Sequence, residues 1–170
     1  AALTQQAQQL FKNTNSKLSQ SEKNTITTLS NLVLNTDTNQ WSDKDGNIVS
    51  VKTFIFDLTD DGIEEVGISY SLENSKNRNE VTSMLFVKDK AANYNLNINA
   101  SGKFYFLNLN KLVYPDVYVR NTAIGLPVYR WNGDRYVNHK SLNPQRLKKY
   151  TVTDMRQASV LHSGVNTVEE

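Results

Sequence analysis

Hydrophobic residues near the start of the chain recur at spacings of three, four and seven. Such spacings place side chains on one face of an α-helix, so an amphipathic helix is predicted over residues 3–18. Its hydrophobic face consists of Leu3, Ala7, Leu10, Phe11 and Leu18. Ser19 and Glu22 then have the spacing of a capping box, which predicts a second helix over residues 20–35. Its inward-facing residues are expected to be Ile26, Leu29, Leu32 and Val33.

From Trp41 onward the hydrophobic residues alternate with polar ones, which is the pattern of half-buried β-strands. Residues 43–47 have the Asp and Gly content of a tight turn. Asn132 and Gly133 are expected to supply the two positive φ angles of a type I′ hairpin turn. In the strand at 93–99, all the hydrophobic residues are expected to lie on one side. The predicted strands cover residues 48–58, 65–72, 80–88, 93–99, 103–109, 117–120 and 128–131.

The order of these elements predicts an α+β fold, with an N-terminal helical pair packed on an antiparallel β-sheet or meander. Asp154 is expected to cap a short C-terminal helix over 155–162, which Gly164 ends and which a frayed tail follows. No β–α–β alternation or glycine-rich phosphate loop is present, which argues against a nucleotide-binding fold. The expected organisation is one domain, 1–170, with a helical segment at 1–36, a β-rich core at 41–140 and a C-terminal tail with a short helix at 141–170.

The amino-acid composition of the chain argues against several functional classes. The chain has no cysteine, which excludes disulfides, thiolate metal sites and a cysteine nucleophile. Nineteen basic and seventeen acidic residues give a net charge of +2, which is not the basic excess of a nucleic-acid-binding domain. No apolar run is long enough to cross a membrane. The start Ala1-Ala2-Leu3, followed by polar residues, is typical of a chain after signal-peptide removal, so a periplasmic or secreted location is expected.

The stretch from Asp57 to Glu65 carries the most informative chemistry. Five of its nine residues are carboxylates, and none is basic. Oxygen donors fall at every second position, and Gly62 lies where the chain must turn, as in loops that wrap a calcium ion. The expected ligands are the side chains of Asp57, Thr59, Asp61 and Glu65 and the backbone carbonyl of Ile63.

This loop resembles the Asp-x-Asn-x-Asp-Gly-x-x-Asp/Glu calcium loop of dockerin-like and FG-GAP or VCBS-type repeats. The segments 114–120 and 128–137 resemble sequences that accompany such a loop in small exported bacterial proteins. The resemblance implies an exported β-rich module stabilised by Ca²⁺, and it implies no activity. Thr59 replaces the usual Asp or Asn, and Ile68 stands where an EF-hand has its bidentate Glu. The alternative interpretation is a β-hairpin in which Asp and Gly serve only the turn.

No set of catalytic residues is evident, so the chain is not predicted to be an enzyme. His139 and His162 have no ligand or base partner at a recognisable spacing and are expected to be exposed. No serine lies in a nucleophile motif. A hydrolase with an unrecognised site remains an alternative.

A protein-binding role follows from small size, a rigid sheet and the acidic loop. The first hypothesis is a periplasmic inhibitor or immunity protein that binds a basic, cell-wall-targeting enzyme. The alternative is a calcium-stabilised surface or carbohydrate-binding module. The expected partner contacts are Asp60, Asp61, Glu64 and, at the hairpin tip, Trp131.

Overall fold

The structure is a computed structural model that describes residues 2–75, 80–110, 112–121 and 126–164. Its helices are α1 (Gln5–Phe11), α2 (Gln20–Ser30), the 3₁₀ helix η1 (Pro144–Lys149) and α3 (Met155–Ser163). Its first six strands are β1 (Val33–Asn35), β2 (Gln40–Ser42), β3 (Ile48–Phe56), β4 (Glu65–Leu72), β5 (Thr82–Lys88) and β6 (Tyr94–Ser101). The remaining strands are β7 (Lys103–Leu107), β8 (Asp116–Arg120), β9 (Leu126–Trp131), β10 (Tyr136–Leu142) and β11 (Val152–Asp154).

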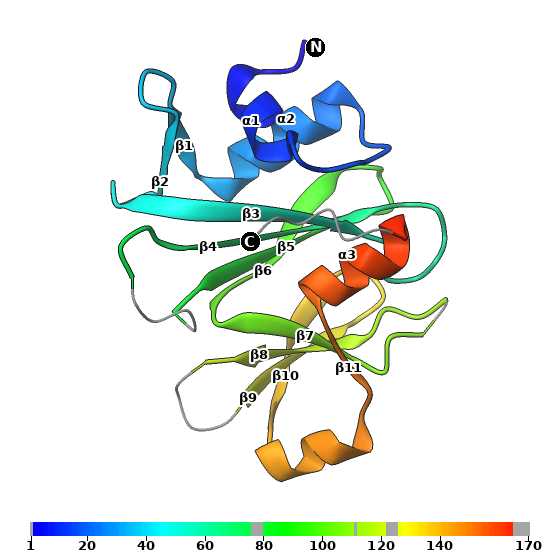
Figure 1. Ribbon diagram of the computed structural model, residues 1–170. Helices are drawn as coiled ribbons and strands as arrows, with labels where there is room; N and C mark the ends of the chain where they lie inside the picture. Colours follow the sequence, from blue (N-terminus) through cyan, green and yellow to red (C-terminus); the bar gives the residue numbers. More distant parts are fainter. Residues whose placement is uncertain (1, 76–79, 111, 122–125, 165–170) are drawn as a thin grey trace.

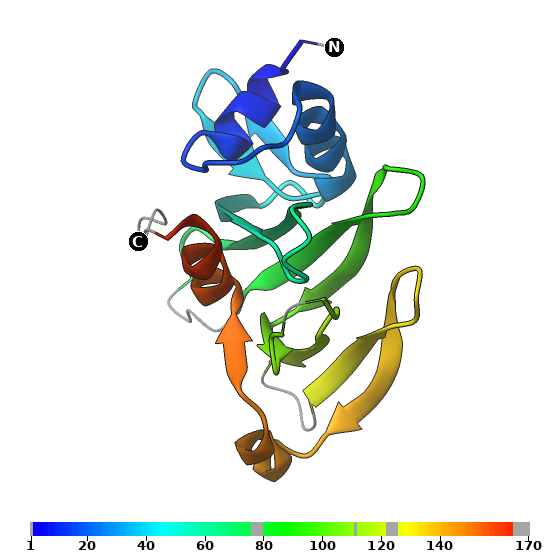
Figure 2. The same ribbon diagram turned by 90° about the vertical axis from the view of Figure 1, so that its right-hand side faces the viewer.

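The α+β fold class is confirmed, but the expected single sheet is wrong. The strands form two antiparallel sheets, one in the order β1-β2-β3-β4-β5-β6 and the other in the order β10-β9-β8-β7-β11. The first sheet is a meander, since its spatial order is its order along the chain. In the second sheet, β11 returns after η1 to pair with β7. Figures 1 and 2 show α1 and α2 above the first sheet and α3 beside both sheets.

Both N-terminal helices are shorter than predicted. After Phe11, the Thr14 backbone N–H and hydroxyl both bond the Phe11 carbonyl, which ends α1 because polar side chains compete for backbone groups. Leu18 is still buried, outside the helix. The capping box of Ser19 and Glu22 is confirmed, and α2 ends at Asn31, whose φ is +57°. Residues 33–35, expected to be helical, form β1, in which Val33 points outward.

Two main hydrophobic clusters lie on opposite faces of the first sheet. One cluster combines residues of α1 and α2, such as Phe11 and Ile26, with Val66 and Ile68 of β4. The other combines Phe54 and Phe56 with residues of the second sheet and of α3. Strand β4 is buried along its first half, and Leu58 of its connection to β3 belongs to the second cluster.

The predicted alternation of β6 is wrong, because this strand contains a β-bulge. Leu96 pairs with Phe86 and Ile98 pairs with Leu85, so Asn97 has no partner on β5. Leu96 packs against the cluster that contains the helices, whereas Ile98 belongs to the cluster between the sheets. The two residues were expected on one face, and the extra residue sends them to opposite faces.

The C-terminal helix is confirmed, with a capping box at Asp154 and Gln157 and a left-handed Gly164. The hairpin at Asn132 is also confirmed, but its turn is not type I′. Its loop has four residues, and the Asn132 side chain accepts from the N–H groups of Asp134 and Arg135. The predicted fraying concerns 165–170, outside the described residues. Among the residues that are described, no helix is both long and apolar enough to span a membrane.

Candidate cation site in the β3–β4 connection

The connection from β3 to β4 is folded around the carboxylate of Asp57. Asp57 Oδ2 accepts from the Gly62 N–H at 2.8 Å, and Oδ1 accepts from the N–H groups of Thr59 and Asp61 at 3.3 Å. Gly62 has a φ of +83°, which explains glycine at this position. Asp61 Oδ1 in turn accepts from the Ile63 N–H. These contacts wind the loop so that its oxygen-bearing side chains face a common point.

Three of the predicted ligands come together in space. One carboxylate oxygen from each of Asp57, Asp61 and Glu65 lies within 4.8 Å of the other two. Two oxygens bound to one Ca²⁺ lie at most about 5 Å apart, twice the usual bond length. The three carboxylates therefore fit a shared cation, and when all three are ionised without one, their negative charges repel each other.

Glu65 is the most unusual of the three. Its side chain is fully buried, and Oε1 accepts from the Leu58 N–H at 2.5 Å. Oε2 is buried as well, and no described group meets it with hydrogen-bond geometry. Burial, with the neighbouring charges of Asp57 and Asp61, raises the Glu65 pKa to about 9. Its other neighbours include the side chain of Tyr114, whose pKa is raised by burial and by the charge of Glu65. No cationic side chain among the described residues contributes to the pKa of Glu65, so the ionised form lacks a positive partner.

The remaining predicted ligands are Thr59 and Ile63. Thr59 is buried, and its Oγ1 has no hydrogen-bond partner among the described residues. Within the described part of the chain, three buried side-chain atoms lack a hydrogen-bond partner, and two of them, Thr59 Oγ1 and Glu65 Oε2, belong to this loop, the third being Ser16 Oγ. The Thr59 carbonyl accepts from Leu112 N–H at 2.8 Å, which ties the loop to the segment before β8. The Ile63 carbonyl stays a predicted ligand.

Two other Asp-initiated turns provide an internal comparison. Asp43 accepts from the N–H groups of Asp45 and Asn47, and Asp89 accepts from those of Ala91 and Asn93. Those backbone bonds lower the pKa of the Asp43 carboxyl, although burial acts in the opposite direction. Neither turn holds a buried carboxylate. A turn alone accounts for Asp57, but it does not account for the buried Glu65.

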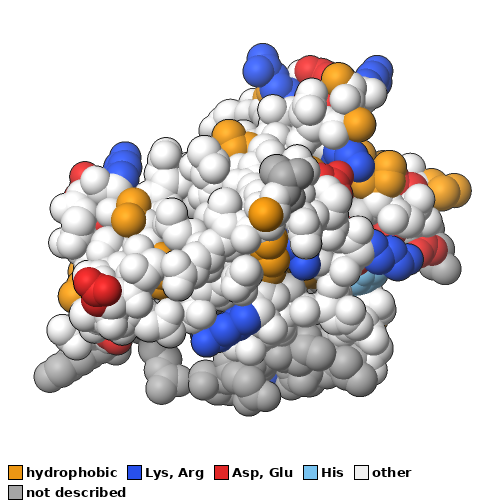
Figure 3. Space-filling view, turned by 90° about the horizontal axis from the view of Figure 1, so that it is seen from above, with side chains coloured by type: hydrophobic (Ala, Val, Ile, Leu, Met, Phe, Trp, Pro, Cys, Tyr) orange, Lys and Arg blue, Asp and Glu red, His pale blue; other side chains and the backbone are white. Residues whose placement is uncertain are grey.

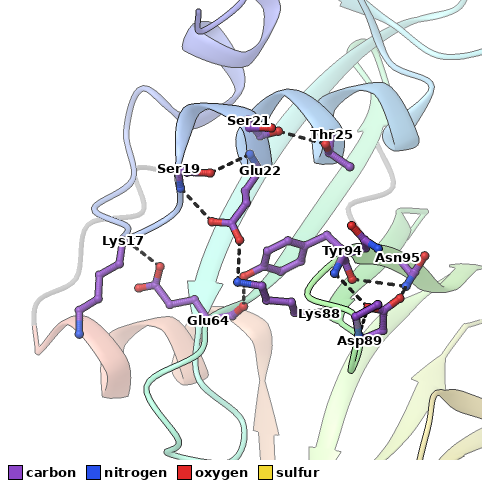
Figure 4. A network of polar contacts seen from close by, with 12 residues as sticks. Lys17, Ser19, Ser21, Glu22, Thr25, Glu64, Lys88, Asp89, Tyr94 and Asn95 are labelled. Atoms are coloured by element: carbon purple, nitrogen blue, oxygen red, sulfur yellow. Dashed lines mark hydrogen bonds and ion pairs between the residues drawn. The ribbon is translucent and has the colours of Figure 1, made fainter. Parts of the chain in front are cut away.

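Glu64 was expected on the surface, and that expectation is wrong. Its side chain is only 4% exposed; Oε1 accepts from the Lys17 N–H at 2.7 Å, and Oε2 lies 2.7 Å from His162 Nε2. The Tyr94 hydroxyl donates to the Glu64 carbonyl at 2.6 Å (Figure 4). Glu64 therefore joins three parts of the chain and has no surface for a partner.

The expectations for the histidines and for Trp131 have different outcomes. His139 is exposed as predicted, whereas His162 contacts Glu64 and its side chain is 23% exposed. Trp131 stacks on Tyr114 with ring centres 4.2 Å apart and is only partly exposed, so it is not a protruding anchor. The His162–Glu64 contact spans 98 positions, and no sequence spacing indicated it.

Asp60 and Asp61 are exposed, as a partner-binding role requires. In the view from above, acidic, basic and hydrophobic side chains adjoin on the right, the side of the β3–β4 connection in Figure 1 (Figure 3). Ile63 is 44% exposed and Leu112 is 82% exposed. The outer surface of the loop is thus acidic with exposed aliphatic side chains.

A polar groove of about 520 Å³ lies elsewhere, between the β5–β6 and β9–β10 hairpins. Asn97 Oδ1 accepts from the Tyr136 N–H at 2.8 Å and joins the two sheets there. Asn95 donates to Asp89 at 2.6 Å, so this amide is already engaged. The groove contains no cluster of metal ligands and does not include Trp131.

No family model, curated protein or solved structure matches this chain. The resemblance of the loop to calcium-binding repeats therefore depends on the residues from Asp57 to Glu65 and on the arrangement described above.

Proposed function

We propose that this protein is a calcium-stabilised binding module, with Ca²⁺ held in the β3–β4 connection. The observation that carries the proposal is the buried, unpartnered Oε2 of Glu65 beside the carboxylates of Asp57 and Asp61. A cation supplies the missing positive charge and removes the repulsion among the three carboxylates. Its role is structural, because it ties the end of β3 to the start of β4.

The donor set favours Ca²⁺ over other metals. All the proposed ligands are oxygens, namely three carboxylates, the Thr59 hydroxyl and the Ile63 carbonyl, and hard cations prefer oxygen. Mg²⁺ requires near-octahedral geometry and usually keeps several waters, whereas Ca²⁺ accepts irregular sets of six to eight oxygens. Calcium modules outside the cell often bind weakly, in the range of about 10⁻⁴–10⁻³ M. We therefore propose a periplasmic or secreted location.

The proposed module binds rather than catalyses, and its proposed partner is another protein with a basic surface. Asp60 and Asp61 present exposed carboxylates beside the exposed Ile63, a surface complementary to basic and aliphatic side chains. Binding to immobilised basic cell-wall hydrolases should weaken as salt increases and should fall in Asp60→Asn. If Asp60→Asn binds the hydrolases as tightly as the wild type, or if no hydrolase binds the wild type, then basic cell-wall hydrolases are not the partners of this surface.

The ion site is tested by adding calcium to metal-free protein. Ca²⁺ at one hundred times its dissociation constant should raise the unfolding free energy by about 2.7 kcal/mol and the melting temperature by about 5–10 °C. Asp61→Asn should abolish both this shift and the calorimetric heat of binding. Asp43→Asn, at a turn without a buried carboxylate, should preserve both. If millimolar calcium neither raises the melting temperature of the wild-type protein nor gives a heat of binding, the loop holds no ion, and its Asp and Gly residues serve only the turn.

A further inference from the structure

Glu64 and Glu65 are consecutive residues with different surroundings. The Glu65 carboxylate belongs to the cation cluster, whereas the Glu64 carboxylate contacts His162 Nε2 and the Lys17 N–H. Consecutive side chains of extended backbone point to opposite sides. One peptide unit therefore connects the proposed ion site to the contact with the C-terminal helix.

Helix α3 is attached near both of its ends to residues beside Glu65. Near its start, Met155 lies over Gly67 and Phe56, in the cluster between the sheets. At its last turn, His162 contacts Glu64 at 2.7 Å. Gly67 is two residues after Glu65, and Glu64 is one residue before it. Any shift of the backbone at Glu65 therefore acts on both attachments of α3.

Without a cation, Oε2 of Glu65 is buried with no hydrogen-bond partner among the described residues, so movement of its backbone toward water gives this oxygen the polar contacts that it lacks. Bound Ca²⁺ holds Glu65 in the buried position, and this position is the one in which Glu64 meets His162. A ligand shifts an equilibrium only by its different affinity for the two states, and this geometry supplies that difference.

We propose that calcium binding in the β3–β4 connection fixes helix α3 in place through Glu64 and His162. His162 is thus a positioning residue of the ion site, although it is not a ligand. The coupling presupposes the ion site of the proposed function. It adds a calcium-dependent attachment of the C-terminal helix to the body of the protein.

The first test is hydrogen exchange of α3 in the full chain, with calcium and with chelator. Coupling between two sites usually amounts to a factor of about 5–150, so calcium should slow exchange of residues 156–163 at least about fivefold. Asp61→Asn should show no such change. The β1–β2 hairpin, which pairs with β3 at Ile48 and Val49, the end away from Asp57, is the internal control.

The second test uses reciprocity, which requires that the helix contact also affect calcium affinity. His162→Ala should weaken calcium binding at least about fivefold by calorimetry. A purely electrostatic effect would change the calcium affinity in the opposite direction. Removing the histidine would leave the Glu64 carboxylate near the site without this neighbour, so calcium would bind equally tightly or more tightly. His162→Gln retains a hydrogen-bond donor and should restore part of the affinity. Leu161→Ala, at a neighbouring position that is 72% exposed, should leave it unchanged.

The outcomes separate the two proposals. If wild-type protein binds no calcium, the proposed function fails, and the coupling fails with it. If calcium binds but α3 exchanges equally fast in both conditions and His162→Ala binds as the wild type does, the coupling is overturned while the ion site stands. If His162→Ala does not fold, the wild-type exchange experiment and His162→Gln still decide the question.

Discussion

Met155 occupies the space that a side chain on Gly67 would need. A Cβ atom at Gly67 would lie 2.3 Å from Met155 Sδ and 3.1 Å from the Phe56 ring. Strand β4 therefore accepts α3 closely only because position 67 is glycine. The close approach, rather than an unusual backbone angle, is the reason for glycine here, since Gly67 is not among the residues with positive φ.

Gly67→Ala should destabilise the protein by about 1–3 kcal/mol, because extra atoms in a packed core force neighbouring side chains to shift. Urea unfolding measures the change. The matched control is the double variant Gly67→Ala with Met155→Ala, in which the new methyl group enters the space that Met155 leaves. The double variant should therefore lose less than the sum of the single losses. If the loss of stability in the double variant equals the sum of the two single losses, the two positions are not in contact.

The pH dependence of metal-free protein should reveal the buried Glu65. Its folded pKa is raised to about 9 from an ordinary value of 4.5, so between these values the folded state keeps a proton that the unfolded state releases. Stability from this group is complete below about pH 4.5 and is lost as pH rises toward 9. Urea titrations in chelator between pH 5 and 8.5 should give a falling free energy of unfolding. A contribution that rises with pH, measured as the difference from Glu65→Gln, would contradict this assignment.

Glu65→Gln should have opposite effects with and without calcium. In chelator at pH 8 the variant should be more stable than wild type by at least about 1 kcal/mol, because the unfolded chain no longer gains from ionising this residue. The amide oxygen can still accept from Leu58, and the amide nitrogen can donate toward Asp57 and Asp61. With calcium the order should reverse, since the variant lacks a charged ligand. Glu22→Gln, a carboxylate paired with Lys88 outside the loop, is the control and should respond to calcium as the wild type does.

Leu112 combines a φ of +75° with an 82% exposed side chain. A left-handed backbone costs an ordinary L-residue about 1–2 kcal/mol, and this leucine recovers little of that by burial. Leu112→Gly should therefore stabilise the protein by about 0.5–1 kcal/mol, even after the greater chain entropy of glycine. Leu112→Ala keeps the strained backbone and should give no gain. Equal stabilities of the Gly and Ala variants would show that the φ value carries no cost.

Local patterns predicted much of this fold. The strand at 65–72 and the caps of α2 and α3 follow from alternation and from Ser19, Glu22, Asp154 and Gly164, because these signals depend only on nearby residues. The division of the strands into two sheets could not be predicted from these local signals. It depends on which strands pair, and the pairing of β11 with β7 joins segments that are distant in sequence.

Part of the candidate site was predictable, because its ligands lie close together in the sequence. Spacing along a short loop placed Asp57, Asp61 and Glu65 together, and the structure brings them within reach of one ion. Glu64 appeared equivalent to its neighbours in an acidic run. Its burial depends on Lys17, Tyr94 and His162, none of which is close to it in sequence. Alternation along an extended strand could have separated Glu64 from Glu65, but not identified these contacts.

The bulge at Asn97 sets one residue of β6 aside from the pairing with β5. A chain with Asn97 deleted would place Leu96 directly before Ile98, and these two residues would still lie opposite Phe86 and Leu85 and keep their present faces. The deletion would instead remove the side chain that accepts from the Tyr136 N–H of the second sheet. The extra residue of β6 therefore serves as a connector between the two sheets, and its loss should loosen their attachment while the hydrophobic pattern of the strand is kept.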